Sequence, residues 1–106
     1  LSSNSDEEKV ILLISLKGVS IAVASSLLTI INPKNYGIID IRVWQLLHLY
    51  DEVQNKPRGQ GFNLKDYEKY LLILRKYAKK FNVNVRDIER ILFFHHKKIQ
   101  EGNLYK

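Results

Sequence analysis

Apolar residues recur at helical spacing along most of this chain, and short runs containing Gly, Pro or Asn separate the apolar stretches. Between residues 64 and 81 the apolar positions step by three and four, which is typical of an amphipathic helix that packs one face on a core. No stretch alternates apolar and polar residues between hairpin turns, so strands should be absent or very short. The pattern predicts an all-α, compact bundle of about five helices, at residues 6–16, 21–31, 41–53, 64–81 and 85–100.

Turn and capping residues mark the ends of these helices. Ser5 precedes Glu8 by three residues, a spacing that permits a capping box at the first helix. Asp40 stands immediately before the third helix, where its carboxylate can cap free backbone N–H groups. Residues 54–62 contain one Pro and two Gly and are predicted to be the most flexible linker. With 106 residues, the chain is predicted to form a single domain, 1–106.

Composition narrows the classes of function. The chain has no cysteine, which excludes disulfides, cysteine nucleophiles and thiolate-bound metals, and we expect no cofactor. Its longest apolar stretch, residues 19–31, is interrupted by Ser and Thr and is shorter than the ~20 residues of a bilayer-spanning helix. We therefore expect a cytoplasmic protein that does not associate with membranes. Because the chain begins at Leu1 and contains no methionine, we also expect it to be part of a larger protein.

The net charge of +6 is concentrated in the C-terminal half. Residues 1–53 carry four Lys or Arg and six Asp or Glu, whereas residues 54–106 carry thirteen and five. Along the predicted fourth helix, basic residues at steps of four, seven and four share one side: Lys65, Lys69, Lys76 and Lys80. Such a stripe can follow a DNA backbone, and a solubilising surface is the equally open alternative.

The segment LKGVSIAVASSLL, which begins at Leu16, resembles the helix-hairpin-helix consensus, in which an apolar residue and a proline precede Gly-Val-Gly and a helix. A glycine turn at a helix N-terminus presents backbone N–H groups that bind phosphate oxygens without reading sequence. The resemblance places such a hairpin at residues 6–31. It implies that the turn contacts double-stranded DNA through Lys17, Gly18, Val19 and Ser20.

A second likeness lies downstream of the turn. Asp40 follows Gly18 by 22 residues and opens the segment DIRVW, which resembles the aspartate segment of helix-hairpin-helix (HhH-GPD) DNA glycosylases, in the endonuclease III branch. This resemblance covers about residues 10–50. The later segment NVRDIERILFF is similar to the ending of a group of poorly characterised microbial proteins with the same hairpin. The resemblance implies that Asp40 is catalytic, beside a flipped nucleotide, and a plain helix cap is the alternative.

Departures from the glycosylase pattern change the expected chemistry. Lys17 replaces the usual proline and Ser20 the second glycine, while Ala22 stands where lyase members carry a lysine. A monofunctional or inactive member is therefore expected, rather than a lyase. A helical module that binds proteins without catalysis stays open as an alternative. His95 and His96 are adjacent rather than one helical turn apart, so we expect packing roles and no metal site.

Overall fold

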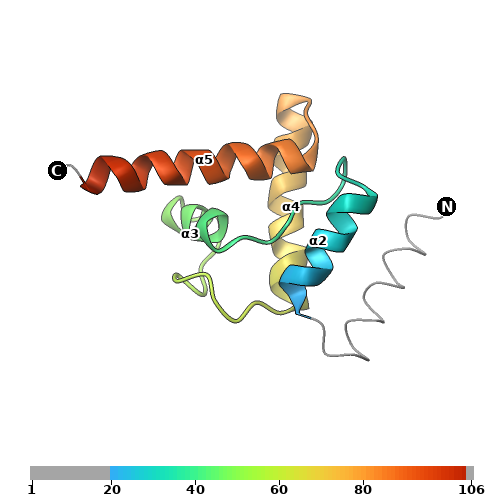
Figure 1. Cartoon of the computed structure of the whole chain (residues 1–106), viewed down its shortest axis with the longest axis horizontal. Coiled ribbons are helices and arrows are strands. Elements are labelled where there is room, and N and C mark those ends of the chain that lie inside the picture. The colour runs from blue at the N-terminus through green and yellow to red at the C-terminus, as the bar shows by residue number, and fades with distance from the viewer. Residues whose placement is uncertain (1–19, 105–106) are drawn as a thin grey trace.

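The computed structural model describes residues 20–104, with side chains through residue 100, and within that range its regular secondary structure consists of helices alone. Its elements are α2 (Ile21–Ile31), α3 (Ile41–Leu49), α4 (Leu64–Phe81) and α5 (Val85–Leu104). Figure 1 shows α5 crossing the upper part of α4, with α3 below α5 and α2 beside α4. The all-α class is confirmed for this range. The predicted first helix, 6–16, and turn residues 17–19 lie outside the described residues.

Aromatic residues of α3 and α4 form the centre of the core. Trp44 and Tyr70 are completely buried, and their rings stack with centroids 6.4 Å apart. Phe62 also lies against Trp44, at 5.0 Å between ring centroids. Because such rings bury large apolar areas in fixed orientations, they set the relative positions of α3, α4 and the connecting segment. Trp44, Tyr67 and Tyr70 therefore serve as packing residues.

Two helix ends differ from the sequence prediction. The third helix ends at Leu49, and its predicted extension to Val53 is wrong. The backbone N–H of Glu52 donates to the Leu47 carbonyl at 2.8 Å, and Asp51 adopts a left-handed φ of 62°, a combination that closes a helix. The fifth helix continues to Leu104, beyond the predicted end at residue 100. Helices α2 and α4 have the predicted bounds.

Residues 54–62, expected to be a flexible linker, make specific contacts with α3 and α4. The Trp44 indole donates to the Asn55 carbonyl at 3.1 Å, and the Gln45 side chain donates to the Arg58 carbonyl at 3.0 Å. Lys56 forms an ion pair with Asp66 at the start of α4. These partners fix the path of the segment along α3, and composition alone does not reveal them.

Candidate nucleic-acid interface

The segment 36–39, which leads into α3, is fastened by side chains from three helices. Four hydrogen bonds from side chains hold its backbone. Tyr67 Oη donates to Gly37 O and Tyr70 Oη donates to Ile38 O, both at 2.9 Å. Glu89 Oε1 accepts from Ile38 N at 2.9 Å, and Ser25 Oγ accepts from Ile39 N at 3.0 Å. Buried backbone groups require such partners. The start of α3 is thus placed by α2, α4 and α5 together.

Two details make this fastening tight. A Cβ atom added to Gly37 would lie 3.1 Å from Leu74 Cδ1 and 3.3 Å from Glu89 Cβ, so a glycine permits the close approach to α4 and α5. Burial, followed by the negative charges of Glu89 and Asp40, raises the pKa of the Tyr70 hydroxyl well above its ordinary 10.0. Tyr70 therefore keeps its proton and remains a hydrogen-bond donor at physiological pH.

Asp40 caps α3 with one of its two carboxylate oxygens. Oδ1 accepts hydrogen bonds from the backbone N–H groups of Arg42 (2.8 Å) and Val43 (3.2 Å), which confirms the capping role expected from the sequence. Within residues 20–100, Oδ2 accepts no hydrogen bond, and the side chain is partly exposed. One oxygen can therefore act on a bound molecule while the other holds the helix.

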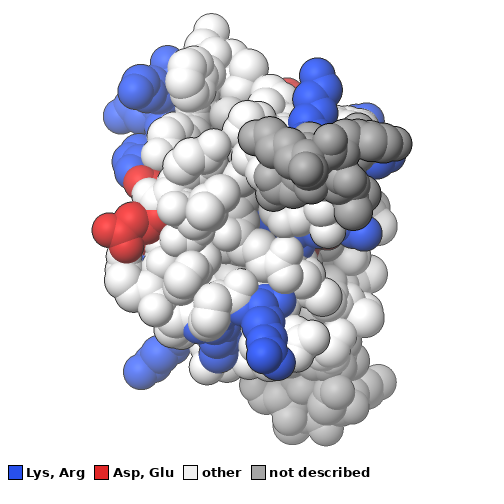
Figure 2. All heavy atoms as spheres, turned by 90° about the vertical axis from the view of Figure 1, so that its left-hand side faces the viewer, with Lys and Arg blue, Asp and Glu red and all other residues white. Residues whose placement is uncertain are grey.

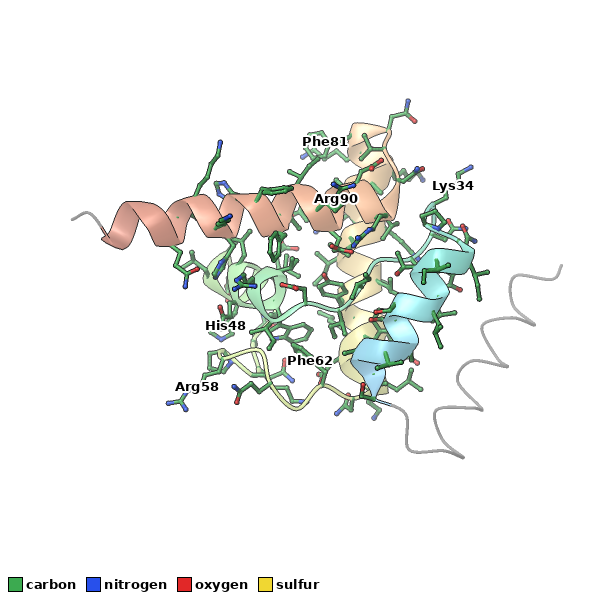
Figure 3. All side chains as sticks on the ribbon, in the orientation of Figure 1. Lys34, His48, Arg58, Phe62, Phe81 and Arg90 are labelled. Carbon is green, nitrogen blue, oxygen red and sulfur yellow. The ribbon has the colours of Figure 1, made fainter. Side chains whose placement is uncertain are left out.

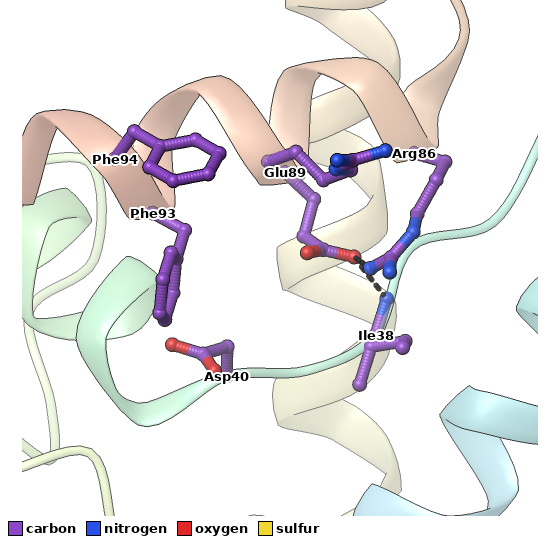
Figure 4. Close-up of a pocket in the computed structure, with 7 residues that line it drawn as sticks. Ile38, Asp40, Arg86, Glu89, Phe93 and Phe94 are labelled. Atoms are coloured by element: carbon purple, nitrogen blue, oxygen red, sulfur yellow. Dashed lines mark hydrogen bonds and ion pairs between the residues drawn. The ribbon is translucent and has the colours of Figure 1, made fainter.

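Asp40 lines a cleft between α5 and the fastened segment, called here the Phe93 cleft (Figure 4). Its volume is about 320 Å³, and its lining consists of Ile38, Asp40, Arg86, Glu89, Arg90, Phe93 and Phe94. Figure 4 shows Phe93 and Asp40 at one end of the cleft and Arg86 paired with Glu89 at the other. Two aromatic rings, two carboxylates and two cations thus surround one small space.

Asp40 also lines a second cleft, called here the Ser20 cleft, at the beginnings of α2 and α3. Its volume is about 530 Å³, and it is lined by Ser20 to Ala22, Ile39 to Arg42 and Gly59 to Phe62. Ser20 caps α2, since its Oγ accepts from Val23 N at 3.2 Å. The structure therefore brings the described end of the expected hairpin turn and Asp40 into one cleft.

Three arginines that the sequence pattern did not identify as site residues stand at these two clefts. Arg86 and Arg90 line the Phe93 cleft, and the Arg42 guanidinium lies 5.3 Å from the Phe93 ring centroid. Arg86 is already paired with buried Glu89, whereas Arg42 and Arg90 are exposed. The sequence did carry a signal for two of them. Arg86, Arg90 and Phe93 follow one another at steps of four and three, which places them on one face of a helix.

The predicted lysine stripe lies elsewhere. None of its four residues lines the Phe93 cleft or the Ser20 cleft. Lys65 and Lys69 line a separate hollow of about 230 Å³ beside Trp44. Lys76 forms an ion pair with Glu52 at 3.2 Å, and Lys80 lies 5.7 Å from the Phe81 ring centroid. The sequence-predicted residues thus divide between two surfaces, one with Ser20 and Asp40 and one with the lysines.

The histidines of α5 contact α3. His95 Nε2 lies 3.0 Å from the Tyr50 hydroxyl, and His96 Nε2 lies 3.1 Å from Gln45 Oε1. Among the side chains that the structure describes, no group of three His, Asp or Glu residues is arranged to hold a metal ion.

The helices within residues 20–104 include none with the length and apolar character to cross a membrane. Lys17, Gly18 and Val19 lie outside the described residues.

No protein-family model, curated protein or solved structure matches this chain. Its function is therefore inferred from the residues themselves and from the geometry of the two clefts.

Proposed function

We propose that this chain is a DNA-binding domain of a DNA glycosylase-like repair protein and that it binds the phosphate backbone of double-stranded DNA without sequence preference. The supporting observation is the Ser20 cleft, in which the N-terminus of α2, Asp40 and Arg42 meet. The first N–H groups of a helix and a guanidinium are both good ligands of phosphate oxygens. The Lys17–Ser20 turn would extend this phosphate-binding surface.

The proposal has a second part, N-glycosidic hydrolysis, in which a nucleotide must first turn out of the duplex. The Phe93 cleft supports this part. A base turned out of the stack needs an aromatic or apolar surface, which Phe93 and Phe94 provide next to Asp40. In N-glycosidic hydrolysis the bond between sugar C1′ and the base breaks, water adds to C1′, and the water proton leaves with the base. The Asp40 carboxylate would stabilise the positive charge on the sugar and orient that water. Ala22 in place of a lysine fits hydrolysis without lyase chemistry.

DNA binding is tested by titrating a fluorescent random-sequence duplex at several salt concentrations. We expect Arg42→Gln to reduce the slope of log affinity against log salt by about one, because one phosphate contact is lost. Lys79→Gln is the matched control: it removes the same charge from an exposed position outside both clefts and should leave the slope unchanged. Absence of binding at low salt, or no effect of Lys17→Glu and Arg42→Gln, would refute the proposal.

Catalysis is tested with Asp40→Asn, because asparagine caps helices about as well as aspartate but carries no charge. The full-length gene product is incubated with duplexes that contain uracil, 8-oxoguanine or alkylated bases, and base release is measured. We expect the variant to keep its melting temperature and DNA affinity while base release falls by roughly 100-fold or more. Equal base release by variant and wild type would remove Asp40 from the mechanism, and DNA binding without base release would leave a binding domain only.

A further inference from the structure

An apolar groove opens on the flank of α5 opposite the Phe93 cleft, between the ends of α3 and α4. Its volume is about 470 Å³; Leu47 and Ile88 are buried at its base. Three large residues at its edges are unusually exposed for their type: Tyr50 at 56%, Phe81 at 59% and Ile91 at 58%. Single exposed apolar residues are ordinary, but a group of them around one groove is typical of an interaction surface.

This apolar groove is separate from the proposed DNA-binding surface. No residue lines both the groove and either of the Asp40 clefts. Helical geometry explains the separation, because at about 100° per residue Ile88 and Ile91 point to one flank of α5 while Arg86 and Arg90 point to the other. A molecule in the groove would therefore leave Asp40 and its clefts open.

Charges at the edge of the groove indicate the character of its occupant. Lys76 Nζ lies 4.8 Å from the ring centroid of Tyr77, and Lys80 Nζ lies 5.7 Å from that of Phe81. Glu52, the acid in the lining, is already paired with Lys76. Figure 2, seen from the side of α3, shows a broad uncharged surface with Lys and Arg at several places around it and a group of Asp and Glu at its left edge. Apolar side chains flanked by carboxylates would match this arrangement.

We propose that the apolar groove docks an acidic amphipathic helix from a partner protein. Such a helix places apolar side chains at i, i+3 or i+4, and i+7 into a groove, and a flanking carboxylate meets Lys80, which forms no ion pair within the described residues. The groove has the size of pockets that hold organic ligands, about 300–1,000 Å³, which leaves room for more than one apolar side chain. A second copy of this chain would bring the same lysines to the interface, and DNA offers phosphates rather than apolar side chains.

The test is selection of binders to the whole chain from a displayed library of helical peptides, followed by fluorescence anisotropy with the enriched peptide. We expect the enriched peptides to carry Leu, Ile or Phe at helical spacing, flanked by Asp and Glu. Ile91→Asp should weaken the affinity at least tenfold, and Lys80→Glu several-fold. Leu72→Asp is the matched control, because Leu72 is 70% exposed on α4 outside the groove; it should leave the affinity unchanged. Phe81→Asp is a second groove variant should Ile91→Asp alter the melting curve.

Several results would overturn the proposal. One is enrichment of basic or uncharged peptides, or of none above background. Another is that the wild type, Ile91→Asp and Phe81→Asp all bind the peptide with equal affinity. A dimer in sedimentation that Ile91→Asp dissociates would assign the groove to a second copy. A large loss of DNA affinity in Ile91→Asp would instead make the groove part of the DNA-binding surface.

Discussion

Single polar side chains decide how the backbone near Asp40 is held. Ser25 is completely buried in α2, and its hydroxyl both donates to the Ala22 carbonyl at 2.8 Å and accepts from Ile39 N at 3.0 Å. Ser25 thereby satisfies a buried N–H group one residue before Asp40.

Ser25→Ala should therefore destabilise the fold more than Ser26→Ala does. The change leaves Ile39 N buried without an acceptor, which costs about 1–3 kcal/mol. Ser26→Ala is the matched control, since within the described residues the Ser26 hydroxyl bonds to its own helix alone, to the Ala22 carbonyl at 3.0 Å. Its effect should stay within about 0.5 kcal/mol. Urea unfolding of both variants measures the difference, and equal midpoints would contradict this account of Ser25.

Asp66 is the residue from which a pH dependence of stability is expected. Burial raises its pKa, but hydrogen bonds from Lys56, the Asn63 backbone and the Asn55 side chain, with the charge of Lys56, lower it overall below the ordinary 3.8. A carboxylate with a lowered pKa in the folded state stabilises the fold above the unfolded pKa. That contribution disappears as the pH falls through the folded pKa.

Asp66→Asn should reduce the free energy of unfolding by about 1.5–3 kcal/mol at pH 7, because charge-assisted hydrogen bonds are lost. The difference in free energy of unfolding between the wild type and Asp66→Asn should narrow as the pH falls below 3.8. Urea unfolding at a series of pH values gives both quantities. Glu68→Gln, an exposed change on the same helix, should show no such gap. A gap that is constant down to pH 2 would assign the effect to packing instead of charge.

At the scale of elements, the segment between α3 and α4 packs against the start of α3 and supports it. Gly59 adopts a φ of 69°, and an added Cβ would lie 2.8 Å from the Ile41 carbonyl oxygen. Gly61 has nearly the same φ, 70°, but no atom of the described residues, other than its own and those of its two chain neighbours, lies within 4 Å of the position of its Cβ. Both glycines meet a conformational need, and only Gly59 also meets a steric one.

This pair predicts a graded response to alanine. Gly61→Ala should cost about 1–2 kcal/mol from the left-handed backbone alone. Gly59→Ala should cost clearly more, because either the segment or the first turn of α3 must move. Since Gly59 and Ile41 line the Ser20 cleft, this variant should also weaken DNA binding. Urea unfolding and duplex titration of the two variants test this, and equal costs would mean that the contact with Ile41 relaxes freely.

At the scale of the whole molecule, α5 separates two surfaces of different chemistry. One flank carries the Phe93 cleft with arginines and an acid, and the other carries the apolar groove bordered by lysines. Figure 3 shows Arg90 and Phe81, one residue from each surface, close to α5 near its crossing with α4. If both proposals hold, this arrangement would let DNA and a partner helix bind at the same time.

The two basic surfaces should contribute unequally to DNA binding. Arg42→Gln with Arg90→Gln should reduce the salt slope by about two, because both cations stand at the Asp40 clefts. Lys65→Gln with Lys69→Gln removes the same charge from a hollow that Asp40 does not line, and should change the slope by less than one. Duplex titration over a range of salt concentrations measures both slopes. An equal loss would show that DNA reaches the lysine stripe as well.

The sequence by itself determined which segments are helical within residues 20–104. Periodicity and capping are interactions between residues a few positions apart, so the bounds of α2 and α4 and the capping role of Asp40 followed from local pattern. The end of α3 did not follow, because a polar residue in a left-handed conformation ended a helix whose apolar pattern continued to Val53.

Only the tertiary structure decided what surrounds Asp40. Its clefts combine the starts of α2 and α3, the segment 59–62 and one flank of α5, which are distant along the chain. The same packing directed the lysine stripe away from Asp40 and brought arginines toward it. Such groupings depend on how helices cross and on which buried polar atoms find partners. These are properties of the packed chain, which local spacing does not encode.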